Sequence, residues 1–260
     1  MKLTRLALAA PLVLLACATP GSDAPDAKAH LGAAVKAAHG ADLYSAGVVR
    51  TDFSLVAGGT PAMAGSLAYE AATGRSRIDL DGGVTIVFDG QSAWVSPAEA
   101  QMQGARFHVL TWPYFMAAPW KLADPGTRIT EAGLAPLGGT QYLNAKLEFE
   151  SGVGDSPDDW YEIYADPTSN RLEALAYIVT YGPTSVDEAE AEPHVALYSN
   201  YIDVEGMQLA TRMVIKDWAP TGELGADDLY LVTFGNYSTG PAREGEFDQP
   251  ADAREDALPR

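Results

Sequence analysis

Cysteine and basic residues are scarce in this chain of 260 residues. Its single cysteine, Cys17, excludes an intrachain disulfide. Lys and Arg together number 17 against 35 Asp and Glu, which gives a formal net charge of -18. Affinity for nucleic acid and adhesion to anionic lipid both depend on Lys and Arg. The composition therefore argues against a nucleic-acid partner and against direct electrostatic binding to a membrane surface.

The chain also lacks recognisable patterns of catalytic or metal-binding residues. Its four histidines, His30, His39, His108 and His194, have no metal-ligand spacing. No G-x-S-x-G elbow occurs, and the glycine-rich "SGVGDSPDD" (151–159) lacks the lysine and the following helix of a phosphate loop. We interpret this stretch as a hairpin turn, and we expect no enzyme activity, no metal and no cofactor.

Long apolar runs are missing except at the N-terminus. Residues 6–15 are apolar and follow the basic residues Lys2 and Arg5. The run is too short to span a membrane and is typical of a secretory signal. It predicts that residues 1–16 are a cleaved signal peptide.

The end of this run, Leu14-Leu15-Ala16-Cys17, resembles the lipobox of bacterial lipoproteins. The resemblance implies that Cys17 is acylated and anchors the chain stably on a membrane, with residues 17–27 as a tether. A free reactive thiol is the competing interpretation of Cys17. Ala18 in place of aspartate favours the outer membrane, so we expect a cell-envelope lipoprotein that faces the periplasm.

The remainder predicts one domain over residues 28–237. Residues 26–40 have a helical composition that ends at Gly40, and extended segments separated by turn residues follow. We expect a mainly β fold, a single antiparallel barrel that is not closed, with an N-terminal helix. Residues 182–193 are expected to be an acidic surface loop, and residues 238–260 a largely disordered acidic tail. The expected strands number about eleven: 48–57, 67–73, 75–80, 84–88, 93–96, 143–150, 160–164, 172–181, 195–204, 207–216 and 229–237.

An aromatic segment, "WPYFMAAPWKLADPG" (112–126), interrupts this series of strands. Its prolines predict an irregular backbone rather than a regular helix or a central strand. Its apolar content is too high for an ordinary surface loop, so we expect it to cover an apolar surface.

The order of these features resembles the LolA/LolB-like superfamily of periplasmic lipoprotein carriers. The shared features include a D-G-x-x-x-W hairpin at Asp89-Gly90 and Trp94. A related family of secreted bacterial proteins of unassigned function is more similar. It shares P-[FWY]-K-L-x-D-P-G at 119–126, W-Y-x-x-x-D-P at 160–167, where the chain has one residue more than the pattern, and a motif from Gly206 through Leu209 to a near-placed Arg212. The resemblance covers residues 28–237.

This resemblance implies a half-barrel with a concave apolar face and a helical or loop segment, here 97–123, across its mouth. The expected ligand-binding residues are then Trp112, Tyr114, Phe115, Met116 and Trp120. They are equally expected as a permanent core without a ligand. The leading hypothesis is a membrane-anchored lipoprotein that binds an apolar ligand, such as a lipid, an acyl chain or a lipoprotein, as carrier or sensor. The alternatives are a non-catalytic envelope assembly lipoprotein with a filled cavity and an unidentified protein partner, and an enzyme with an unrecognised site.

Overall fold

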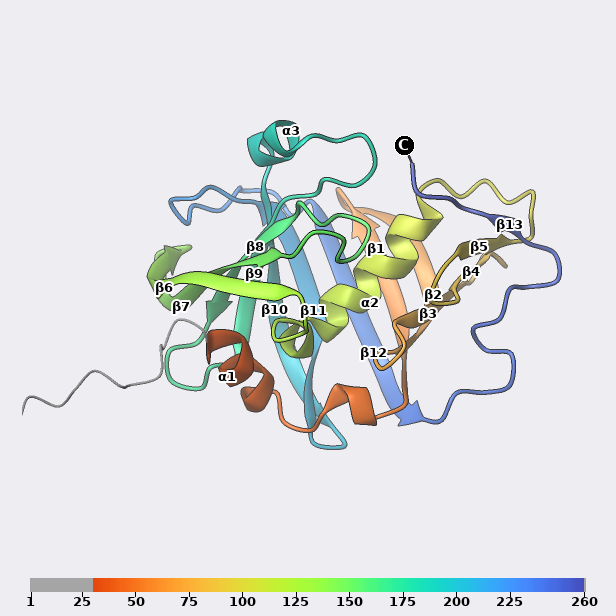
Figure 1. The fold of residues 1–260 in the computed structure, drawn as a ribbon, viewed down its shortest axis with the longest axis horizontal. Helices are drawn as coiled ribbons and strands as arrows, with labels where there is room; N and C mark the ends of the chain where they lie inside the picture. The colour runs from red at the N-terminus through yellow and green to blue at the C-terminus, as the bar shows by residue number, and fades with distance from the viewer. Residues whose placement is uncertain (1–29, 260) are drawn as a thin grey trace, which may run out of the picture.

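The computed structural model describes residues 30–259, so the expected signal peptide, Cys17 and the whole of the expected tether lie outside the described residues. One antiparallel sheet of thirteen strands forms the body, and its two outermost strands do not pair with each other. Figure 1 shows the strands curving around a long central helix. The expected mainly β, unclosed barrel is confirmed. In sheet order the strands are β13 (Arg254–Glu255), β5 (Ala93–Ser96), β4 (Thr85–Phe88), β3 (Arg75–Leu80), β2 (Thr60–Glu70), β1 (Val48–Ala57), β12 (Tyr230–Gly240), β11 (Met207–Asp217), β10 (His194–Val204), β9 (Leu172–Tyr177), β8 (Trp160–Ala165), β7 (Thr140–Phe149) and β6 (Thr127–Leu137).

Two meanders make up this sheet, and the pairing of β1 with β12 joins them. Because side chains alternate between the faces of a strand, Val49, Thr51, Phe53 and Leu55 of β1 are all buried on the same face. Phe53 lies opposite Phe234 of β12 across the junction. The main hydrophobic core lies on this concave face, between the sheet and the helices.

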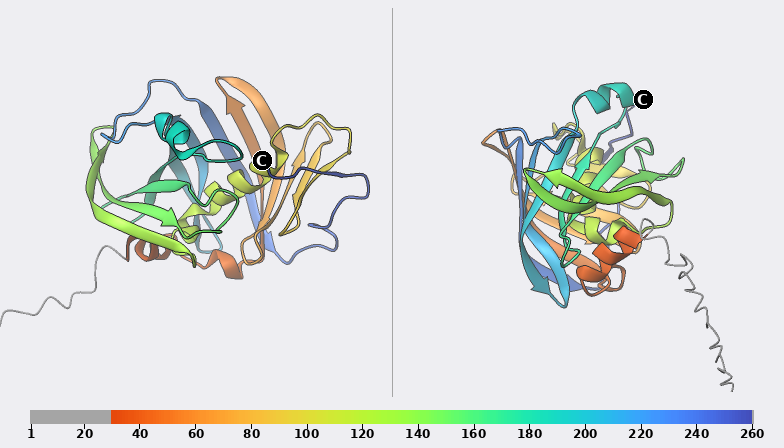
Figure 2. Two further views of the ribbon diagram at one scale, coloured as in Figure 1. Left: turned by 45° about the horizontal axis from the view of Figure 1, so that its top comes forward. Right: turned by 90° about the vertical axis from the view of Figure 1, so that its left-hand side faces the viewer.

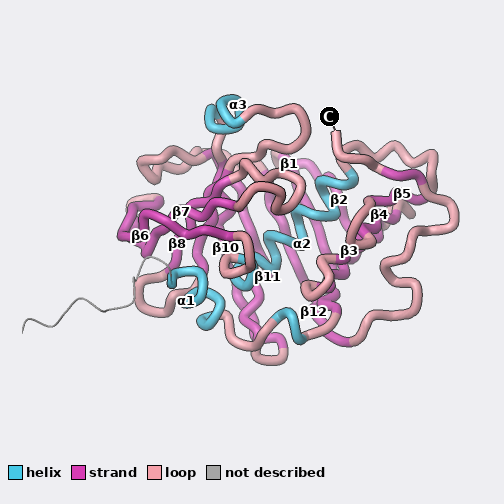
Figure 3. Tube along the Cα trace, in the orientation of Figure 1, coloured by secondary structure: helices cyan, strands magenta, loops and turns pink. Residues whose placement is uncertain are grey.

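Helix α2 (Ala105–Lys121) lies across the concave face, as the turned views in Figure 2 and the cyan helix in Figure 3 show. The expectation of an irregular backbone here is wrong, because the helix continues through Pro113 and Pro119. A proline has no N–H to donate to the carbonyl four residues earlier, which leaves two carbonyl oxygens of α2 free. These oxygens belong to Val109 and Phe115.

Two side-chain hydroxyls from the sheet satisfy these freed carbonyls. Ser76 of β3 donates from Oγ to the Val109 oxygen at 2.6 Å, and Tyr198 of β10 donates to the Phe115 oxygen at 3.1 Å. Since the unpaired carbonyl of an interior proline is part of what destabilises a helix, these two bonds offset that cost and also fasten α2 to the sheet.

Helix α1 (Leu31–Ala38) confirms the predicted N-terminal helix and is followed by the short 3₁₀ turn η2 (Leu43–Ser45). His39, at the end of α1, is fully buried. Its Nδ1 lies 2.8 Å from the Gln208 carbonyl oxygen, and its Nε2 accepts from the Leu172 N–H at 3.0 Å. The ring is therefore neutral with its proton on Nδ1, and burial lowers its pKa to about 4. His39 is a structural histidine.

Two elements differ from the sequence expectations in the middle of the chain. Residues 182–193, expected as a loop, contain the short exposed helix α3 (Val186–Ala191), which begins with a capping box between Ser185 and Glu188. Strand β6 was not expected, because Gly133 and Pro136 and a bulge between Thr130 and Gly133 break its alternation.

The described residues after β12, 241–259, have fixed contacts, in contrast to the disordered tail expected over 238–260. In Figure 1 the residues after β12 run around the outside of β3, β4 and β5. Phe247, only 2% exposed, packs on Val48, Ala68 and Val87 on the convex face. Arg50 pairs with Glu246 through two hydrogen bonds of 2.7 Å, and β13 pairs with the edge strand β5. One buried aromatic ring and an edge strand give this polar segment a fixed place.

Candidate functional site

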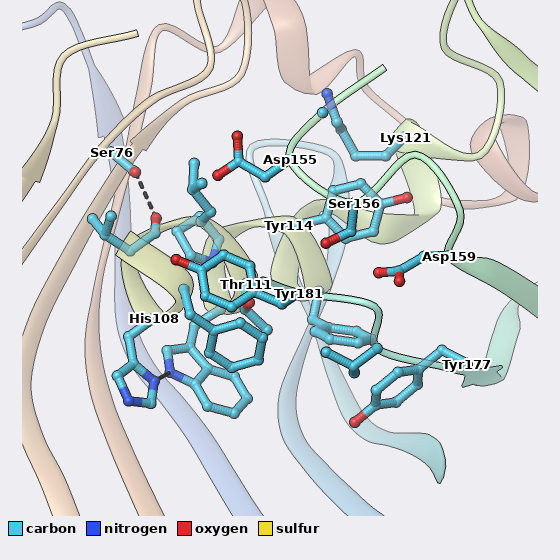
Figure 4. Close-up of a pocket in the computed structure, with 18 of the residues that line it drawn as sticks. Ser76, His108, Thr111, Tyr114, Lys121, Asp155, Ser156, Asp159, Tyr177 and Tyr181 are labelled. Carbon is cyan, nitrogen blue, oxygen red and sulfur yellow. Dashed lines mark hydrogen bonds between the residues drawn. The ribbon is translucent and has the colours of Figure 1, made fainter. Parts of the chain in front are cut away.

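A cavity of about 580 Å³ lies beside α2, between that helix, the concave face of the sheet and the loop that joins β7 to β8. Figure 4 shows side chains from these elements converging on it. Most of its lining is aromatic or aliphatic. Its principal residues are Leu55, Tyr69, Phe88, Phe107, His108, Leu110, Thr111, Trp112, Tyr114, Phe115, Lys121, Asp124, Phe149, Val153, Asp155, Asp159, Tyr161, Tyr177, Val179, Tyr181, His194, Ile215 and Tyr230.

The structure divides the five expected ligand-binding residues into two groups. Trp112, Tyr114 and Phe115 line the cavity, whereas Met116 and Trp120 do not. Trp120 is fully buried, donates from its indole N–H to the Ala41 carbonyl oxygen at 2.9 Å, and packs edge-on against His39. Met116 is 5% exposed and belongs to the main core. Because successive residues point about 100° apart around a helix, one aromatic run faces both the cavity and the core.

Aromatic pairs form one wall of the cavity. The rings of Tyr114 and Tyr161 are stacked with centroids 5.8 Å apart, and Phe149 lies edge-on to Tyr161 at 5.6 Å. Phe115 contacts Tyr177 at 4.9 Å. Tyr161 and Tyr177 were not among the expected site residues, although the alternation in β8 and β9 could have placed both on the concave face.

A polar cluster lies at the C-terminal end of α2. Lys121 Nζ is 2.6 Å from Asp124 Oδ2, and the hydroxyl of Tyr44 donates to the other carboxylate oxygen of Asp124. The Lys121 ammonium also lies 5.4 Å from the centre of the Tyr44 ring. Both charges are therefore compensated before any ligand is considered.

A second ion pair lies at the N-terminal end of α2. Arg106 donates to both carboxylate oxygens of Asp155, at 2.6 and 2.9 Å, and its guanidinium lies 5.3 Å from the Phe88 ring centre. The backbone N–H of Arg106 donates to Asp256 of the C-terminal segment at 2.9 Å. Three segments distant in sequence are thus joined beside the cavity.

Asp159 is the remaining charged group of the lining. Its Oδ1 accepts from both the N–H and the hydroxyl of Thr180, each at 2.7 Å. Burial raises the pKa of Asp159 to about 6, and the two hydrogen bonds from Thr180 oppose that rise. Figure 4 shows its carboxylate directed into the pocket towards Tyr114 and Ser156. From the sequence alone, Asp159 was placed only at the end of the expected hairpin turn 151–159.

Neither a metal-binding cluster nor a helix able to cross a membrane occurs among the described residues. No group of three described His, Cys, Asp or Glu side chains in residues 30–130 and 132–259 is arranged to hold a metal ion. No described helix is long and apolar enough to cross a membrane.

Comparison with known proteins identifies the fold. No protein-family model matches the sequence, and no curated protein is significantly similar to it. Among solved structures, a LolA superfamily protein from Nitrosomonas europaea superposes with a TM-score of 0.54 at 10% identity, covering 86% of this chain and 99% of that protein.

Two further solved structures superpose on this chain to a similar extent. A putative outer membrane lipoprotein-sorting protein domain from Vibrio parahaemolyticus has a TM-score of 0.52 at 9% identity, over 85% of this chain and 96% of that one. A DUF1329 family protein from Desulfovibrio piger has a TM-score of 0.53 at 10% identity, with the same two coverages. The resemblance inferred from the sequence is confirmed at the level of the fold, and the protein has a LolA-like fold.

Proposed function

We propose that this protein is a non-enzymatic lipoprotein of the bacterial cell envelope that binds an apolar ligand in its half-barrel, as carrier or sensor. The observation that carries this proposal is the cavity of about 580 Å³ beside α2. A cavity of this size with mostly apolar walls and a few polar groups is typical of small-molecule binding sites.

The fold and the N-terminal sequence support the same proposal. One structure with this fold is described as a lipoprotein-sorting domain, which agrees with an acyl chain or lipoprotein as ligand. The lipobox-like sequence before Cys17 supports an anchor on the outer membrane, facing the periplasm. The alternative of an assembly lipoprotein with a filled cavity is less well supported, because α2 and the sheet leave this volume unfilled.

Binding of the uncharged fluorophore N-phenylnaphthylamine tests the proposal. We expect saturable binding to the wild-type protein, and native mass spectrometry should reveal a co-purified lipid. Val179 lines the cavity and is half-buried, so Val179→Trp should occupy part of the cavity and weaken binding at least about tenfold, the effect of losing roughly 1.4 kcal/mol.

Leu134→Trp provides the matched control, since Leu134 is 66% exposed on β6 and lies outside the cavity lining. This variant should bind the fluorophore as the wild type does. Failure of the wild-type protein to bind the fluorophore, together with the absence of any co-purified lipid, would exclude the proposed function.

A further inference from the structure

We propose that Asp159 binds the polar head of the ligand, and that this head is a cationic hydrogen-bond donor such as a primary amine. The inference rests on the proposed function and specifies the ligand class: an apolar chain with an ammonium head, rather than a fatty acid or another anionic lipid.

The first argument is the pairing of charges around the cavity. Lys121 pairs with Asp124, and Asp155 pairs with Arg106. Asp159 has no cationic partner among the described residues; its neighbours are the hydroxyl and N–H of Thr180, which share Oδ1. The second carboxylate oxygen of Asp159 therefore remains available to a ligand.

The cavity offers no matching site for an anion. The described lining residues include one lysine, which is already paired, and two histidines. His108 accepts the indole N–H of Trp112 on Nδ1 at 3.1 Å, and burial lowers its pKa, so its ring is neutral. His194 lies 3.8 Å from Asp217, which already provides a counter-charge. A carboxylate or phosphate head would thus meet the charge of Asp159 without compensation.

The aromatic residues beside Asp159 supply a second, independent argument. Tyr161 and Tyr177 are each 7% exposed, and their hydroxyls have no hydrogen-bond partner among the described residues, although both side chains line the cavity. The Tyr114 hydroxyl is buried and likewise unpartnered within the described residues. Burial is the main cause that raises the pKa of all three hydroxyls. The nearby Asp159 carboxylate raises each of these pKa values further, because its negative charge disfavours ionisation of a neighbouring tyrosine.

Unpartnered tyrosine hydroxyls and aromatic rings beside one carboxylate suit an ammonium group, which donates up to three hydrogen bonds. An ammonium is attracted to the negative face of an aromatic ring, and more strongly where water is excluded. It can also donate a charge-assisted hydrogen bond to the free oxygen of Asp159. The rest of the cavity, with Leu55, Leu110 and Ile215 in its lining, would accommodate the apolar chain.

Competition with N-phenylnaphthylamine by dodecylamine, dodecanol and dodecanoate tests the inference, near neutral pH and below the concentrations at which these compounds form micelles. Dodecylamine should bind about tenfold or more tightly than dodecanoate, with dodecanol between them. Asp159→Asn keeps an oxygen acceptor for Thr180 but removes the charge, and it should reduce the amine preference by about the same factor.

Asp158→Asn is the matched control, because it removes the same charge from an exposed neighbouring residue. It should leave the preference unchanged. An equal loss in both variants, or a wild-type preference that disappears in concentrated salt, would assign the effect to the overall negative charge and overturn the inference. Equal binding of all three compounds would also overturn it. If none of them binds and the fluorophore does not bind either, it is the proposed function that fails.

Discussion

At the residue scale, the two tryptophans of α2 have different roles. The Trp120 indole N–H bonds to the backbone of a separate segment in a fully buried site, whereas Trp112 bonds to His108 of its own helix and lines the cavity. Trp120→Phe should lower the free energy of unfolding by about 2 kcal/mol or more, because it removes the hydrogen bond of a fully buried indole and opens a void.

The same substitution at Trp112 should cost less stability and change the affinity for N-phenylnaphthylamine. Chemical denaturation and fluorophore titration of the two variants measure both effects. If Trp120→Phe alters the affinity of the folded protein while Trp112→Phe does not, the assignment of the two side chains is reversed.

The buried carboxyl group of Asp159 predicts how the stability of the folded protein changes with pH. Its pKa is raised from 3.8 to about 6, so the folded state binds the proton more tightly than the unfolded state. Ionisation of Asp159 therefore reduces stability progressively as the pH rises from about 4 to about 6. The groups that face it are Asp158 on its own loop and the tyrosines Tyr114, Tyr161 and Tyr177.

Asp159→Asn should accordingly stabilise the ligand-free protein at neutral pH, by on the order of 1–3 kcal/mol. The advantage over wild type should disappear below about pH 4, where the aspartate is protonated in both states. Urea unfolding at several pH values measures this difference. A variant that is less stable than wild type at neutral pH would show that the charge of Asp159 contributes to folding.

At the scale of the element, α2 depends on hydroxyls that the sheet supplies. Ser76→Ala should destabilise the protein by about 1–3 kcal/mol, because the Val109 carbonyl, which receives no N–H from Pro113, loses the hydrogen bond from the Ser76 hydroxyl. Introducing Pro113→Ala into the same chain restores an N–H at residue 113 and should recover part of that loss.

A double-mutant cycle on Ser76 and Pro113 therefore should give a non-zero coupling energy. Pro113→Ala combined with Tyr198→Phe is the control. The Tyr198 hydroxyl donates to the Phe115 carbonyl, which lacks an N–H donor because of Pro119 and not because of Pro113. Additive effects of Ser76→Ala and Pro113→Ala would show that the serine does not compensate for the proline.

The C-terminal segment, residues 241–259, covers the convex face beside β1, β2 and β4 through a single aromatic ring. Phe247→Ala should lower the free energy of unfolding by about 3 kcal/mol, because the ring is 2% exposed and packs on Val48, Ala68 and Val87. Leu258→Ala, at a side chain 39% exposed, is the matched control and should have little effect. Equal effects of the two variants in thermal unfolding would contradict a fixed position for Phe247.

At the scale of the whole molecule, the proposed acylation of Cys17 would determine whether the protein is found in the membrane fraction. Cys17→Ser removes the thiol that would be acylated, so the protein should leave the membrane fraction and lose labelling by a fatty-acid analogue. Thr19→Ser, two residues later, keeps the cysteine and should fractionate as the wild type does. A Cys17→Ser protein that remains fully with the membranes would exclude acylation at this residue as its anchor.

Much of the fold follows from local patterns. The ranges expected from alternation for β1, β3 and β5 coincide with the observed strands, and α1 lies within the expected helix. Alternation and helical composition suffice for these elements because they report which side of a strand or helix is buried. The aromatic segment 112–126 was expected to cover an apolar surface, because its apolar area has to be buried somewhere, and its helical part lies on the concave face of the sheet.

Contacts between residues distant in sequence determine the features that local patterns did not predict. The course of α2 through two prolines depends on Ser76 and Tyr198, and the order of the C-terminal segment depends on Val48 and Val87, none of which is near in sequence. The division of the aromatic run into cavity and core depends on how the helix is rotated on the sheet. Asp159 became a candidate site residue only through its burial. Each of these features arises from partners that folding brings together, and no local pattern encodes them.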